Sequence, residues 1–140
     1  MLNFDVGLQR QLVSAVLDDF SPNDALPDSH GGQYGETPSV WRETVIEFVG
    51  AMLAAGLIAP LPGKDGYADK SPQEICDILR CGDPKGGLDA ELLWDVIHFA
   101  GTEKLATMMR EMGLATWEAR NGGISTALKT ALTGMGIVAA

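Results

Sequence analysis

The fold is decided by the stretch TPSVWRETVIEFVGAMLAAGLIAP, residues 37–60. A hydroxyl at Thr37 or Ser39 can accept the free amide hydrogens of a first helical turn, and Pro38 has the backbone angle that this turn requires. Apolar side chains then recur at helical spacing on one face, at Trp41, Val45, Phe48, Val49 and Met52. Gly56 suits the left-handed residue that ends many helices, with Leu57 folding back on the last turn. The stretch therefore predicts an amphipathic helix that buries one face.

The same start and stop signals recur along the rest of the chain and predict further short helices. These are expected over residues 8–20 and 72–81, from Asp89 to Gly101, from Thr102 to Gly113 and from Ser125 to Gly134. The clearest start is Ser71-Pro72-Gln73-Glu74, because the hydroxyl and carboxylate of a capping box satisfy backbone donors reciprocally. Turn-rich connections join the helices, including a long acidic loop over residues 23–37.

The predicted fold class is all-α, with one compact domain of about five or six short helices over residues 1–140. Proline and glycine in residues 57–68 leave open a small β-hairpin in that segment. With 46% hydrophobic residues, a chain of 140 residues can bury a core of ordinary size. No linker separates two such cores.

Compartment signals favour a cytoplasmic protein. The start of the chain shows no basic region followed by an apolar run and a cleavage site. The longest uncharged apolar stretch, residues 48–61, is interrupted by glycine and proline and is too short to span a bilayer. Cys76 and Cys81 are predicted to be reduced structural thiols, since five helical steps turn them to different faces.

Charge is the most informative feature for function. The chain has 19 Asp and Glu against 10 Lys and Arg, a net charge of −9. Residues 1–59 contain eight of these acids but only two basic residues, Arg10 and Arg42. An acidic surface repels phosphate backbones and attracts basic proteins. Direct binding to nucleic acid is therefore not expected, whereas a protein that itself binds nucleic acid is a suitable partner.

Sequence patterns for catalysis and metal binding are incomplete. Glu91, Asp95 and His98 would share one stripe of the fourth helix, but a metal site in a helical bundle also needs carboxylates and a second histidine from other helices. The other histidine, His30, lies in a glycine-rich loop. No Gly-x-Ser-x-Gly motif marks a nucleophile. We therefore expect no metal, no cofactor and no catalysis, with a small enzyme built from distant carboxylates as the remaining alternative.

The acidic segment consists of Asp18, Asp19, Asp24, Asp28, Glu36, Glu43 and Glu47. With this segment, its length and its single helical domain, the chain resembles the small acidic bacterial immunity proteins of contact-dependent growth inhibition and similar competition systems. These proteins share no single fold or sequence signature, so the resemblance transfers no residue by alignment. It implies a non-catalytic inhibitor that covers the substrate-binding surface of a basic toxin domain, with a nuclease as the leading candidate.

Charge also suggests how such an inhibitor would work. A nuclease presents Lys and Arg to hold phosphates, and an acidic inhibitor can occupy the same donors while steering the encounter. Aromatic anchors would supply affinity, for which Tyr34, Trp41 and Trp117 qualify if they are exposed. Burial in the core is the competing interpretation for Trp41. The predicted partner-binding residues are Asp18, Asp19, Asp24, Asp28, Tyr34, Glu36, Trp41, Glu43 and Glu47.

Two other interpretations of this surface stay open. The chain can be a protein–protein adaptor domain with a different kind of partner. The carboxylates can also serve solubility alone, since a net charge far from zero keeps proteins soluble.

Overall fold

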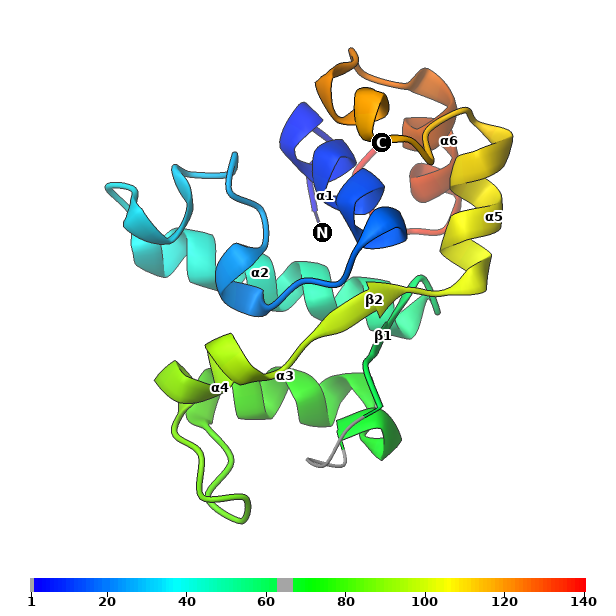
Figure 1. Cartoon of the computed structure of the whole chain (residues 1–140). Helices are drawn as coiled ribbons and strands as arrows, with labels where there is room; N and C mark the ends of the chain where they lie inside the picture. The colour runs from blue at the N-terminus through cyan, green and yellow to red at the C-terminus, as the bar shows by residue number, and fades with distance from the viewer. Residues whose placement is uncertain (1, 63–66) are drawn as a thin grey trace.

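The computed structural model describes residues 2–62 and 67–140, and in these ranges the chain is mostly helical (Figure 1). The α-helices are α1 (Val6–Leu17), α2 (Pro38–Ala54), α3 (Pro72–Cys81), α4 (Ala90–Val96), α5 (Glu103–Glu111) and α6 (Thr126–Gly134). The 3-10 helices are η1 (Pro22–Asp24), η2 (Gly32–Tyr34), η3 (Tyr67–Asp69) and η4 (Trp117–Asn121). Two short strands, β1 (Ile58–Pro60) and β2 (Phe99–Gly101), complete the described elements. The prediction of a mostly helical fold is confirmed.

Local signals placed most of the helix ends correctly. The predicted side-chain caps are present at Ser71, Asp89, Thr102 and Ser125. Ser71 and Glu74 form the full capping box, whose hydrogen bonds lower the pKa of the Glu74 carboxyl. At the end of α2, Gly56 has φ of 73°, and the Leu57 amide donates to the Met52 carbonyl at 2.9 Å. The Thr37 hydroxyl, in contrast, makes no capping hydrogen bond to α2.

The core is built around α2, with α3 and α4 on one side of it and α1 and α6 on the other (Figure 1). The α2 residues Val45, Phe48, Val49 and Met52 are completely buried. Trp41 and Trp94 join α2 to α4, with ring centroids 5.6 Å apart. Both indole N–H groups donate to backbone carbonyls, that of Trp41 to Ala25 at 3.0 Å and that of Trp94 to Leu79 at 2.8 Å. These bonds satisfy polar groups that would otherwise be costly to bury.

A small antiparallel strand pair is present, and its partners are distant in sequence. β1 lies in the segment 57–68, for which the sequence leaves a hairpin open, but residues 63–66 of that segment lie outside the described residues. The partner of β1 is β2, with Ile58 opposite Gly101 and Pro60 opposite Phe99. The pairing is therefore long-range, and α3 and α4 lie between its two strands in the sequence.

Two predicted helices end earlier than expected, for one shared reason. α1 stops at Leu17 rather than Phe20, and α4 stops at Val96 rather than Gly101. Phe20 and Phe99 exchange both backbone hydrogen bonds, at 2.9 and 2.8 Å, and their rings lie 5.8 Å apart. This pairing holds both residues in extended backbone. It competes with the helical pattern, and neither local sequence shows it.

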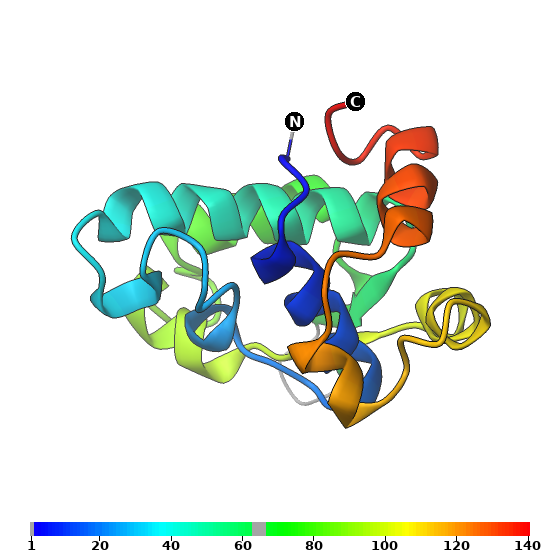
Figure 2. The same ribbon diagram turned by 90° about the horizontal axis from the view of Figure 1, so that it is seen from above.

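The two ends of the described chain are paired as well. Leu2 forms a parallel bridge with Val138, and the Ala139 amide donates to the Leu2 carbonyl at 2.9 Å. Figure 2 shows both ends on the same side of the molecule, close to α6.

None of the helices in the described ranges combines the length and the apolar character needed to cross a membrane.

Replacing Gly101 with alanine is expected to destabilise the fold by about 1–3 kcal/mol, because overpacking forces neighbours to move. The added Cβ would lie 2.9 Å from the Ala15 carbonyl oxygen of α1 and 3.1 Å from Leu105 Cδ2. Gly134→Ala is the matched control: nothing lies within 4 Å of its added Cβ, and alanine favours the helix. Urea unfolding of both variants measures the effect. Equal midpoints for Gly101→Ala and the unchanged chain would contradict the close packing of β2 on α1.

Candidate functional site

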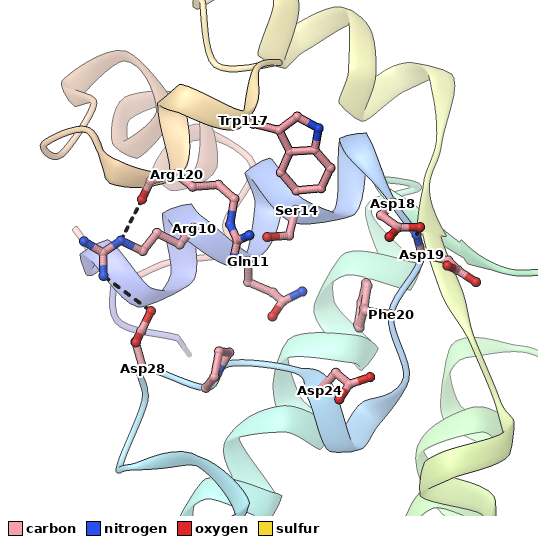
Figure 3. A pocket seen from close by; sticks show the side chains of 11 residues that line it. Arg10, Gln11, Ser14, Asp18, Asp19, Phe20, Asp24, Asp28, Trp117 and Arg120 are labelled. Atoms are coloured by element: carbon pink, nitrogen blue, oxygen red, sulfur yellow. Dashed lines mark hydrogen bonds and ion pairs between the residues drawn. The ribbon is translucent and has the colours of Figure 1, made fainter.

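A groove of about 180 Å³ lies between α1, the segment 18–28 and η4 (Figure 3). Its charged and aromatic lining consists of Arg10, Asp18, Asp19, Phe20, Asp24, Asp28, Trp117 and Arg120. We name it the acidic groove, since four carboxylates face two guanidinium groups. All four of these aspartates belong to the predicted partner-binding set. The structure thus brings the front part of that set together in one concave site.

The η4 wall of the groove is attached to α1 by two neighbouring side chains. Gln9 is 1% exposed; its Nε2 donates to the Gly123 carbonyl at 2.9 Å, and its Oε1 accepts from the Ser125 amide at 2.7 Å. Arg10 Nε donates to the Arg120 carbonyl at 2.8 Å. A buried amide side chain with both ends bonded holds its partners in one geometry. These bonds therefore fix η4 and the start of α6 over α1.

The opposite wall of the groove, the segment 18–28, is attached to α1 by Gln11 and by the Nη1 atom of Arg10. Gln11, also buried, accepts from the Leu26 amide through Oε1 at 2.8 Å. Leu26 has φ of 48°, a left-handed conformation that a bulky residue adopts only when its surroundings hold it there. Arg10 Nη1 lies 3.4 Å from Asp28 Oδ2. The segment that carries the groove's carboxylates is thereby positioned by α1.

The four carboxylates differ in what they contact. Asp19 Oδ2 lies 3.2 Å from His98 Nδ1, although the two atoms are not aligned for a hydrogen bond. Within the part of the chain that the structure describes, Asp18 accepts only from the Asp19 amide at 2.9 Å, and Asp24 accepts from the Ser21 hydroxyl at 3.0 Å. Among the described residues, neither Asp18 nor Asp24 has a cationic partner. These two carboxylates are therefore the ones available to a ligand.

Trp117 supplies an apolar surface beside these charges. Its side chain is 54% exposed, and the guanidinium carbon of Arg120 lies 5.7 Å from the ring centroid. Exposed tryptophans are frequent energetic centres of protein interfaces, and an indole face also attracts cations. The arrangement of carboxylates around an accessible indole suits a positively charged side chain of another protein.

The remaining predicted residues lie elsewhere. Tyr34, which is 91% exposed, and Glu36 lie at and just after η2, away from η4 (Figure 2). Glu43 and Glu47 lie on the outer face of α2, where Glu43 pairs with Arg80 of α3 at 3.1 Å. The hydrogen bond to Glu43 raises the pKa of the Arg80 guanidinium.

Trp41 is not available to a partner. It is 3% exposed, and its indole is hydrogen-bonded inside the core, so the competing interpretation of Trp41 as a core residue is the correct one.

Asp95 and His98, two of the three residues considered as metal ligands, contact different parts of the structure. Asp95 accepts a hydrogen bond from the Asn23 amide, and His98 lies beyond the end of α4, facing Asp19. Within residues 2–62 and 67–140, no three His, Cys, Asp or Glu side chains converge as metal ligands would. Cys76 and Cys81 are both free thiols, and burial raises the pKa of Cys76.

Sequence analysis missed Gln9, Gln11 and the roles of Arg10 and Arg120. A signal was present: Gln9-Arg10-Gln11 is a polar run in a helix whose other residues, apart from Ser14, are apolar. Three consecutive helical residues span about 200° of the helix circumference, so such a run cannot face solvent entirely when most of the circumference is apolar. The partners of these side chains, in contrast, have no local signature.

No family model matches the chain, and neither a curated protein nor a solved structure matches it significantly. The function of the acidic groove therefore has to be inferred from its own residues.

Replacing Gln11 with leucine is expected to destabilise the chain by about 1–3 kcal/mol, because the buried Leu26 amide loses its acceptor. Gln73→Leu is the matched control, since Gln73 is exposed and its amide bonds only to Asp77 on the same helix. Hydrogen exchange followed by NMR should show faster exchange at Leu26 in Gln11→Leu and no change there in Gln73→Leu. Unchanged protection at Leu26 would show that Gln11 does not hold this wall.

Proposed function

We propose that this chain is a non-catalytic inhibitor, an immunity protein, that binds a basic toxin domain through the acidic groove, and that the toxin is a nuclease. One observation carries the proposal. Asp18, Asp19, Asp24 and Asp28 converge on one groove beside the exposed ring of Trp117, and within the described residues only Asp28 is paired with an arginine or lysine. Solubility alone does not account for an exposed indole among these carboxylates.

The proposed mechanism is occupation of the cations that would otherwise hold a substrate. A nuclease uses lysine and arginine side chains to bind phosphates, and carboxylates are the natural protein substitutes for phosphate oxygens. The net charge of −9 steers the encounter over distances of about a Debye length, about 8–10 Å at physiological salt. Asp18 and Asp24 then accept cationic side chains at short range, and Trp117 provides the desolvated contact.

The shape of the groove supports side chains of a macromolecule as its occupants. The acidic groove measures about 180 Å³ and adjoins a second hollow of about 340 Å³, which is lined by Arg10, Asp28, Trp117, Arg120 and Asn121. Small-molecule sites are usually enclosed and mostly apolar. This surface is open and carries charged groups along its length, which suits the side chains of a protein partner.

An adaptor function is the second candidate, and the exposed apolar end of α2 favours it. Tyr34 and Val40 are 91% and 46% exposed and lie near each other in sequence at this end. Binding through such residues would change little with ionic strength, whereas binding through the acidic groove would weaken as salt rises.

The first partner to test is the basic C-terminal domain of a large exported protein, if the reading frame next to this chain encodes one. Co-expression with the chain is expected to restore growth of cells that produce this toxin domain, and the purified chain is expected to block its nuclease activity. Asp18→Lys/Asp24→Lys should slow association roughly tenfold or more at low salt, with a smaller effect at high salt. Stopped-flow mixing at several salt concentrations measures this.

Asp69→Lys/Glu111→Lys is the matched control, because it changes the net charge equally at two exposed carboxylates outside the groove. The test uses Asp18 and Asp24 because lysine at Asp28 or Asp19 would face Arg10 or His98 and disturb the groove itself. Equal slowing by the two double variants would assign the effect to net charge and remove the acidic groove from the interface. Failure of the chain to protect cells or to bind the domain would reject the inhibitor function.

A further inference from the structure

The charges of the acidic groove are unevenly distributed along its length. Figure 3 shows Arg10 and Asp28 toward one end, the Arg120 guanidinium pointing inward from that end over Gln11, and Asp18, Asp19 and Asp24 toward the other end. Arg10 is already used, since it bonds to the Arg120 carbonyl and pairs with Asp28. Asp19 faces His98. Three charged groups remain for a ligand: the inward-pointing guanidinium of Arg120, and the carboxylates of Asp18 and Asp24 toward the other end.

Arg120 is exceptional among the arginines of the described chain. Arg42 donates to the Leu79 carbonyl, Arg80 pairs with Glu43, and Arg110 pairs with Glu103. The Arg120 guanidinium donates no hydrogen bond and forms no ion pair within residues 2–62 and 67–140. It is nevertheless placed, because its backbone carbonyl is held by Arg10 and its side chain lies over Trp117. A guanidinium offers five donors in a planar fork that matches a carboxylate.

We infer that the acidic groove recognises a pair of opposite charges on one segment of its partner. A carboxylate of that segment bonds to Arg120, and an ammonium or guanidinium of the same segment bonds to Asp18 or Asp24. Trp117, which lies between the two ends in Figure 3, receives the apolar part of the segment. This inference rests on the proposed function and adds a selectivity that a uniformly acidic surface lacks. A partner segment with basic residues alone would place one of its cationic side chains against the guanidinium of Arg120, and the two like charges would repel each other.

The test uses capped peptides as probes and the full chain labelled with ¹⁵N. Each peptide has two charged residues separated by one to four Gly and Ser residues, in the combinations Glu/Lys, Gln/Lys, Lys/Lys and Glu/Glu. Titrations follow the Trp117 indole N–H and the Arg120 Nε–H resonances, assigned with Trp117→Phe and Arg120→Lys. The best Glu/Lys peptide is expected to bind about two- to fivefold more tightly than the best Gln/Lys or Lys/Lys peptide, the range that one exposed charge pair contributes.

Two variants identify the groups responsible. Arg120→Gln should reduce the affinity for Glu/Lys to that for Gln/Lys and leave Gln/Lys unchanged, whereas Arg110→Gln, on α5 and paired with Glu103, should change neither. Asp18→Asn/Asp24→Asn should remove the preference for lysine at the other end. Circular dichroism of each variant verifies the fold.

The outcomes separate this inference from the proposed function. Tightest binding by Lys/Lys would show a response to net charge alone; it would overturn the charge-pair inference and leave the inhibitor function standing. Absence of any shift at Trp117 and Arg120 would also overturn the inference. Selective Glu/Lys binding by a chain that fails to neutralise the toxin domain would support the recognition and reject the inhibitor function.

Discussion

Three consecutive polar side chains of α1 join parts of the chain that are far apart in sequence. Gln9 bonds to residues 123 and 125, Arg10 to Arg120 and Asp28, and Gln11 to Leu26. Each buried donor or acceptor left unsatisfied would cost about 1–3 kcal/mol, a large part of the usual stability of a small domain. The two walls of the acidic groove therefore depend on one helical turn. The groove's shape is a by-product of how α1 satisfies its own polar residues.

The electrostatics of the groove reflect a compromise between folding and binding. Carboxylates close together repel one another, and the net charge of −9 adds to that repulsion. Pairing of Asp28 with Arg10 lessens it at one of the four aspartates. Asp18 and Asp24 are exposed, so water screens their charges in the free chain. The carboxylates of Asp18 and Asp24 therefore cost the fold little stability, and they stay available to the proposed interface.

Sequence reasoning succeeded where the deciding interactions are local. Ser71 and Glu74 satisfy donors within the same turn, and Gly56 ends α2 through its own backbone angle. It failed where a distant segment competes with the local pattern, as when Phe20 and Phe99 pair and shorten two helices. No property of either sequence segment specifies that pairing.

For the candidate site, as for the fold, the sequence predicted the part that depends on neighbouring residues and not the part that depends on distant ones. Asp18, Asp19, Asp24 and Asp28 lie within eleven residues, so their convergence follows from proximity along the chain. The second wall is contributed by Trp117 and Arg120, and its placement depends on Gln9 and Arg10, nearly the whole chain length away. Likewise, Trp41 has the residue type of an interface anchor, but its helical face turns it into the core.

The bonds between α1 and residues 120–125 also determine when this polypeptide can reach its native state during translation. N-terminal segments usually begin to fold while the ribosome still adds residues, at about 5–20 residues per second. Here the amide side chain of Gln9 finds its acceptor and donor only after Ser125 has left the exit tunnel. We therefore expect the η4 wall of the acidic groove to form only once residues up to 125 have emerged, long after α1 itself.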